Sequence, residues 1–462
     1  MTFQAHGLLP LLLMLVVSGT AAQSTNGTIP NNPALSASID LIKHKTSHEQ
    51  RISELESQHG PFDARLLEPL TGLTEIVRQE GKLEAMERLL NRRQQLLHIA
   101  EGPATPSQIP VIIDLLRIDL QRGLLDSVTE RFEYLYFIHS ENPQTEPDAL
   151  LNSLNDLRAW HLLAMYLDLP ERRIEHAAHS RKIQERLFLL AEKSYGANSE
   201  RLIPWLYSIA SESYRVVNYL ESEGILFQGA SNHVGREETL ELVKRIQAIV
   251  DYSGNAEAQA MATILLADFQ LLRRESVRSS HSGRLSVSTR GSADRTYRRA
   301  IEMLKDSGVD ATKISDFFSR PMPLPASRFH LSLDAALEQR VAEAAPANHT
   351  EQNEFTRGEP HLGDFLAWTG SLPAARILAA PDLPALVNSD PKIATLRFTV
   401  DSVGRVRSPR TIQDVPNTGS VRSDAQDAIK VLQFRPALID GRWRKVRDIT
   451  MRFVYPPEGS SS

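Results

Sequence analysis

The sequence of 462 residues contains no cysteine. This absence excludes disulfide bonds, thiolate zinc sites, thiol nucleophiles and acylation of a lipoprotein cysteine. The sequence also lacks the GxGxxG and GxxxxGK[ST] phosphate-binding motifs and the GxSxG motif of serine hydrolases. We therefore expect packing alone to stabilise the fold, and we predict no catalytic residues, no cofactor and no metal site.

One pair of histidines has a spacing that would allow both side chains to bind the same metal ion. His176 and His179 lie one helical turn apart, but the glutamate that the HExxH motif requires between its histidines is missing. A plain amphipathic helix is therefore favoured over a shared metal ion. An envelope hydrolase remains the least favoured class, because no nucleophile and base stand in a recognisable arrangement.

Long apolar runs are also scarce. The one prominent run, residues 8–17, is followed by small residues at positions 18–22 and is about half of the roughly 20 residues that a spanning helix needs. This pattern predicts a cleaved signal peptide over residues 1–22, a periplasmic location in a Gram-negative bacterium, and no stable transmembrane span in the mature chain. Because residues 1–22 hold no Lys or Arg, an uncleaved anchor is the alternative.

Beyond a linker and first helix at residues 23–60, residues 61–306 predict a domain of helical hairpins. Apolar residues recur at helical spacing, as at Leu202, Leu206 and Ile209, and strand-like alternation is absent. One hairpin cannot bury its apolar face alone, so five in succession predict a solenoid, with an irregular all-helical domain as the alternative. The predicted pairs are 66–79 with 82–99, 107–120 with 124–138, 148–167 with 172–195, 199–220 with 236–251, and 257–273 with 293–305.

Parts of this region resemble tetratricopeptide repeats of the longer, kinesin-light-chain kind. The resemblance lies in LLAEKSYGAN at 189–198 followed by SIASESY at 208–214, and in ADRTYRRAI at 293–301. It implies a surface that holds a protein partner.

Two segments interrupt the pattern. The Ser/Arg-rich stretch 275–290 has no aromatic residues to stack on bases, so a solvated loop is favoured over a nucleic-acid site and no nucleic-acid partner is expected. Residues 307–388 are rich in proline and predict a connector with short elements: a helix at 331–341 and a strand or helix at 362–368.

From residue 389 to 456 the period changes to that of strands. Ala394, Leu396, Phe398 and Val400 alternate with polar residues, and Gly404 follows in a turn that needs a positive φ. A helix with apolar residues at 425, 428, 429 and 432 comes next, and a final alternating run ends the domain. The order β-β-α-β predicts a small α+β domain with a disordered tail at 457–462. The fold class is therefore multidomain: an all-α helical-hairpin solenoid followed by this domain.

This domain resembles the C-terminal domain of TonB. The resemblance is carried by LRFTVDSVGRV at 396–406, DAQDAI at 424–429, FRPALIDG at 434–441 and the run 446–453. It implies a periplasmic domain whose sheet edge accepts an extended segment of an outer-membrane receptor as an added strand. For this chain it implies strand addition along the last strand, residues 446–454.

The residues expected to bind such a peptide are the last strand and the basic cluster before it. Backbone groups of an edge strand would supply affinity, and outward side chains would supply selectivity; ordinary solvent-facing residues are the alternative. Residues 391–456 hold 13 Lys/Arg against 6 Asp/Glu, and the rest of the chain is acidic, so this domain is expected to dock on its own helices or to meet an acidic partner or an anionic envelope surface. The predicted binding residues are Arg444, Lys445, Val446, Arg447, Asp448, Thr450 and Arg452.

These patterns favour a non-catalytic interaction scaffold that binds a protein or peptide partner, in connection with an outer-membrane transport system. The alternative is an atypical TonB-like energy transducer, which would require the uncleaved N-terminal anchor.

Overall fold

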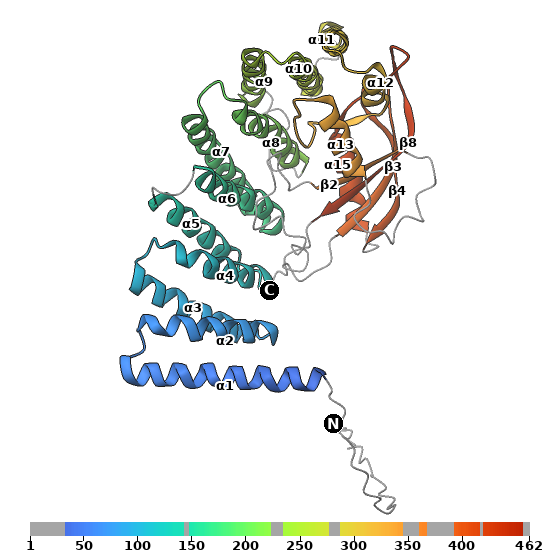
Figure 1. Ribbon diagram of the computed structural model, residues 1–462. Coiled ribbons are helices and arrows are strands. Elements are labelled where there is room, and N and C mark those ends of the chain that lie inside the picture. Colours follow the sequence, from blue (N-terminus) through green and yellow to red (C-terminus); the bar gives the residue numbers. More distant parts are fainter. Residues whose placement is uncertain are drawn as a thin grey trace, which may run out of the picture.

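A computed structural model describes residues 33–142, 147–222, 234–276, 287–344, 360–366, 392–415 and 419–455. The predicted signal peptide and C-terminal tail lie outside these residues, as do residues 277–286 of the Ser/Arg-rich stretch and residues 345–359 and 367–388 of the connector. The chain forms a helical domain followed by a small α+β domain (Figure 1). The helices are α1 Pro33–His59, α2 Leu67–Gln79, α3 Leu83–Glu101, α4 Ile109–Gln121, α5 Leu125–Glu141, α6 Pro147–Leu167, α7 Arg173–Tyr195, α8 Ile203–Ser222, α9 Val234–Ser253, α10 Ala256–Ser276, α11 Val287–Asp306, α12 Ala311–Ser319, α13 Leu333–Ala344 and α15 Gly419–Val431.

The five predicted helix pairs are present as α2/α3, α4/α5, α6/α7, α8/α9 and α10/α11, and each packs against its partner. Three of the pairs begin in the same way. Asp63, Thr105 and Ser199 each accept a hydrogen bond from the backbone N–H two residues later, which caps a single 3-10 turn before α2, α4 and α8. These short polar side chains therefore fix where the first helix of each pair starts.

Glycines in a left-handed conformation close two of the hairpins. Gly81, with φ +67°, separates α2 from α3, and Gly123, with φ +70°, separates α4 from α5. In each turn the backbone N–H groups return to carbonyls of the preceding helix, as from Gly123 to Leu120 at 3.0 Å. The chain thus reverses within three residues, and consecutive helices lie antiparallel.

The proline-rich segment after α11 is structured where it is described. α12, the short strand β1 (Met322–Leu324) and α13 pack on the helices, and Phe317, Phe318, Leu324 and Leu333 belong to the main buried core. α13 matches the predicted helix at 331–341, and the predicted element at 362–368 is a strand, β2 (His361–Leu366). The packing of α12, β1 and α13 onto the main core was not anticipated, whereas the segment of β2 was expected to dock on a neighbour.

The C-terminal domain is a four-stranded sheet with α15 packed on β3 and β4. Ala394, Leu396, Phe398 and Val400 are each at most 1% exposed, as their alternation predicted. The strand order is β2-β8-β3-β4, in which β2 runs parallel to β8 and the other neighbours are antiparallel. The strands of this domain are β3 Lys392–Val400, β4 Val406–Val415, β5 Gln433–Arg435, β6 Ala437–Ile439, β7 Arg442–Arg444 and β8 Val446–Tyr455.

The turn between β3 and β4 has the expected glycine for two reasons. Gly404 has φ +81°, and a Cβ placed there would lie 1.9 Å from the carbonyl oxygen of Phe434. Asp401 accepts hydrogen bonds from the backbone N–H groups of Val403 and Arg405 at 3.0 and 2.9 Å, so the turn is also held by a side chain.

Within the described parts of the chain, no helix is long and apolar enough to cross a membrane.

Candidate functional site

The last strand does not have the free edge that was predicted for it. β8 lies between β3 and β2, and β2 comes from the connector that precedes the C-terminal domain. The Cα partners run from His361 with Thr450 to Leu366 with Val454. The expectation of an open edge along residues 446–454 is therefore wrong for its second half, because another segment of the chain already occupies that edge.

Side chains reinforce the β2–β8 pairing. Arg452 donates to both carboxylate oxygens of Asp364 at 2.6 and 2.5 Å, and His361 Nδ1 lies 3.0 Å from the hydroxyl of Thr450. The rings of Phe365 and Phe453 have centroids 5.2 Å apart. Burial lowers the pKa of His361, which favours its neutral form against Thr450. β2 is thus held by charge, hydrogen bonding and ring contact.

The seven predicted binding residues divide into three groups. Thr450 is 1% exposed and Arg452 is paired with Asp364, so the prediction that these two face solvent is wrong. Val446 pairs with Val400 of β3 and is partly buried. The remaining residues are exposed, as expected of a basic surface cluster: Arg444, Lys445, Arg447 and Asp448.

The two domains meet at Arg435, which sequence reasoning did not single out. This arginine on β5 is 2% exposed and donates from Nε and Nη2 to the two carboxylate oxygens of Asp268 on α10, at 2.8 and 2.5 Å. The hydroxyl of Tyr297 donates to the same carboxylate at 2.6 Å. Burial by itself would lower the pKa of Arg435, but the neighbouring carboxylate of Asp268 has the larger effect, so the pKa of the guanidinium is raised.

Aromatic rings and a strand pair surround this ion pair. The guanidinium of Arg435 lies 4.8 Å from the ring centroid of Phe317, which favours the cation. Trp443 donates to Asp294 on α11 at 2.6 Å, and β5 pairs with β1 from Met322 to Leu324. The C-terminal domain thus docks on its own helices through acidic partners, which is one of the outcomes that the charge distribution predicted.

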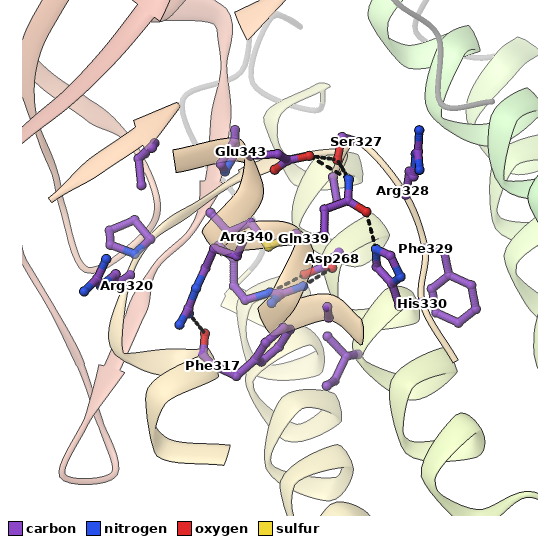
Figure 2. Close-up of a pocket in the computed structure, with 18 of the residues that line it drawn as sticks. Asp268, Phe317, Arg320, Ser327, Arg328, Phe329, His330, Gln339, Arg340 and Glu343 are labelled. Carbon is purple, nitrogen blue, oxygen red and sulfur yellow. Dashed lines mark hydrogen bonds and ion pairs between the residues drawn. The ribbon is translucent and has the colours of Figure 1, made fainter. Parts of the chain in front are cut away.

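A cavity of about 470 Å³ lies at this junction, a volume within the range of ligand sites. Figure 2 shows Arg320 on one side of it, Phe329 and His330 on the other, and Arg340 between. Its walls come from α8, α10, α12, β1, the loop before α13, α13 and β2, and they include Arg435. The apolar part of the lining is formed by Met261, Ile264, Leu265, Phe317, Phe329, Val341 and Leu362.

Several polar groups of the cavity are already bound to one another (Figure 2). Gln339 donates from Nε2 to Ser327 at 2.8 Å and to Glu343 at 2.7 Å, and its carbonyl oxygen lies 2.5 Å from Nε2 of His330. Ser327 also donates to Glu343. This side of the cavity is therefore a closed hydrogen-bond network.

Arg340, the next residue on α13, carries a charge between the two sides of the cavity. It donates to the carboxylate of Asp316 at 2.6 Å and to the carbonyl of Phe317 at 3.3 Å. Burial lowers the pKa of Arg340, Asp316 opposes that effect, and the charges of Arg320 and Arg435 lower it further. The guanidinium groups of the cavity are thus close enough to repel one another.

The two histidines of the predicted amphipathic helix lie in different environments, because His176 is buried and His179 is exposed. His176 lies 3.0 Å from Asp168 through Nε2 and 3.0 Å from Nδ1 of His161 through Nδ1. The rings of His161 and His179 are 5.1 Å apart. Burial, followed by the charges of His176 and His179, lowers the pKa of His161 to about 3. A search of the described residues finds no group of side chains arranged to hold a metal ion.

Comparison with protein-family models and with curated proteins gives no match. Among solved structures, BtubC (BKLC) from P. vanneervenii is similar over 58% of this chain and 92% of that chain, at 15% identity and a TM-score of 0.27. A likeness of this size supports no argument about shared fold or function.

Proposed function

We propose that this chain is a non-catalytic interaction scaffold of the periplasm. A tetratricopeptide-like helical domain holds one partner, and a TonB-like sheet binds an extended segment of another partner by strand addition at β8. The observation that carries this proposal is the β2–β8 pair, because a remote segment of the chain is added to the sheet at the strand where the TonB resemblance implies a peptide. Once β2 leaves, the backbone groups of β8 that it occupied become unpaired, and such groups bind an extended chain with suitable side chains.

The proposal makes β2 a competitor of the partner. β2 is only six residues long, and its side-chain anchors are Asp364 to Arg452 and Phe365 to Phe453. A partner that replaces β2 would reuse these anchors with an acidic and an aromatic residue at the same spacing. The selectivity of the site therefore follows from Arg452, Thr450 and Phe453.

A competition experiment tests this proposal. The double variant Asp364→Ala/Phe365→Ala weakens β2, and a fluorescent peptide with the sequence of residues 359–367 replaces it in trans. Fluorescence polarisation should show binding to the variant about tenfold tighter than to the unaltered chain, because the variant no longer competes. A scrambled peptide is the control. Equal affinity of both chains for the peptide, or no binding to either, would contradict the proposal.

The proposed periplasmic location is tested by identifying the N-terminus of the mature protein. Mass spectrometry of the protein recovered from a Gram-negative envelope should give a mature chain that starts near Gln23. An intact residue 1 or 2 in the membrane fraction would instead favour the TonB-like energy transducer, because such a protein must remain anchored in the inner membrane.

A further inference from the structure

The cavity at the domain junction has features that strand addition does not use. Its volume of about 470 Å³ and its apolar walls suit the body of a small organic ligand. The walls come from segments far apart in the sequence, including Met261 of α10, Phe329 before α13 and Leu362 of β2. The strands β2 and β5 thus contribute His361, Leu362 and Arg435 to a wall that is otherwise formed by the helices and the segment around α13.

Arg435 presents an unsatisfied donor at this cavity. Its Nε and Nη2 are bound by Asp268, but its Nη1 is buried and has no hydrogen-bond partner among the residues that the structure describes. A buried guanidinium N–H without an acceptor costs free energy, and structures usually satisfy such groups by protein, water or ligand. This atom is the first sign that the cavity takes an acceptor.

Two further arginines of the lining are also available. Arg320 and Arg328 are exposed and form no hydrogen bond or ion pair with the described part of the chain. Two of the three acidic residues of the lining are paired with cations, Asp268 with Arg435 and Asp316 with Arg340, and Glu343 accepts from Ser327 and Gln339. Because the lining holds four arginines against these three carboxylates, its net charge is positive.

We propose that this cavity binds a small amphipathic anion, an aliphatic monocarboxylate of the fatty-acid class. The aliphatic chain would lie against Met261, Leu265 and Phe329, and the carboxylate would accept from Nη1 of Arg435 and from Arg320. Carboxylates suit this site because guanidinium groups bind them with directed, charge-assisted hydrogen bonds. Since Arg435 and β2 both contribute to the wall, occupation of the cavity reports that the domains are docked.

The test is isothermal titration of the full-length chain with laurate, below the concentration at which laurate forms micelles. Dodecanol and dodecyltrimethylammonium serve as probes with the same chain and a neutral or cationic head. Laurate should bind at least about tenfold more tightly than either, because only the carboxylate satisfies the guanidinium groups. Equal affinity for laurate and dodecanol would overturn the assignment of an anion.

Two variants locate the site. Ala336→Trp places a large ring in the cavity wall and should abolish laurate binding, and Arg320→Gln should weaken it about tenfold. Arg410→Gln, an exposed arginine outside the cavity, is the matched control and should bind as the unaltered chain does. Circular dichroism confirms that each variant is folded. Undiminished binding by folded Ala336→Trp would overturn the proposal, as would the absence of laurate binding to the unaltered chain.

Discussion

Arg435 is a charged residue at a place from which water is excluded, and its environment explains how the charge is tolerated. Asp268 neutralises it, and the ring of Phe317 lies against its guanidinium. Such a buried pair is not in itself a large source of stability, but the loss of one partner leaves an uncompensated charge in the core.

The variant Arg435→Ala should therefore destabilise the chain by about 3–5 kcal/mol, because Asp268 would remain buried without a cation. Urea denaturation followed by far-ultraviolet circular dichroism measures this loss. Lys313→Ala breaks the exposed ion pair with Asp334 and is the control, which should change the unfolding transition little. A loss for Arg435→Ala no greater than for the control would contradict the account.

His161 offers a second prediction at this scale. Its pKa of about 3 in the folded chain is below the ordinary 6.5, so between these pH values the unfolded chain binds a proton that the folded chain does not. The contribution of His161 to the free energy of unfolding is therefore fully present above pH 6.5, and it is lost as the pH falls from 6.5 toward 3. The groups facing it are His176 and His179 of α7, and Asp168 lies beyond His176.

From pH 7 to pH 5 the contribution of His161 should cost about 2 kcal/mol of unfolding free energy. The measurement is urea denaturation at each pH, compared with His161→Asn, in which this part of the pH dependence should disappear. His98→Asn, at an exposed histidine, should retain it. The same pH dependence in His161→Asn as in the unaltered chain would show that the buried histidine is not responsible.

At the scale of elements, the turn after β3 depends on one glycine. Gly404→Ala meets both a positive φ and the carbonyl of Phe434, whereas Gly441→Ala, with φ +69°, meets no atom within 4 Å. The first variant should therefore cost at least about 2 kcal/mol more than the second. Thermal denaturation of the two variants makes this comparison. Equal midpoints would show that the backbone can shift away from the added methyl group.

Elements with local patterns could be predicted from the sequence. The five helix pairs, the buried alternation of β3 and the turn at Gly404 depend on residues close together in the chain, so their periodicity is visible without the fold. The tetratricopeptide and TonB resemblances stay predictions.

What could not be predicted depends on pairing between distant segments. The run His361–Leu366 was recognised as a possible element, but its parallel partner lies some ninety residues downstream, as in His361 with Thr450. Periodicity says nothing about which strand is its neighbour. The spacing of His176 and His179 likewise does not indicate which of the two is buried, because His161, the partner of His176, lies on the preceding helix.

Arg435 was missed for a related reason. Charged residues are rarely fully buried, and a basic residue in a basic domain is expected at the surface. Only Asp268, 167 positions away on α10, makes its burial possible. No signal in the sequence connects the two, although the opposite charges of the two domains did indicate that they could meet.

At the scale of the whole molecule, the C-terminal sheet and the helices share one junction. β1 pairs with β5, Trp443 packs on the main core, and α15 contacts α8. In Figure 1 the sheet lies beside the last helices of the helical domain, and the earlier helices α1 to α5 extend away from it. The proposed peptide site at β8 and the proposed anion site therefore belong to the same end of the molecule.

The absence of cysteine makes the central claim directly measurable. Leu366 and Val454 are Cα partners across β2 and β8, so Leu366→Cys/Val454→Cys allows a disulfide that fixes β2 in place and leaves Asp364 and Arg452 unchanged. In fluorescence polarisation with the peptide of residues 359–367, the oxidised variant should show no binding and the reduced variant should bind. Equal binding in the two states would contradict strand addition at β8.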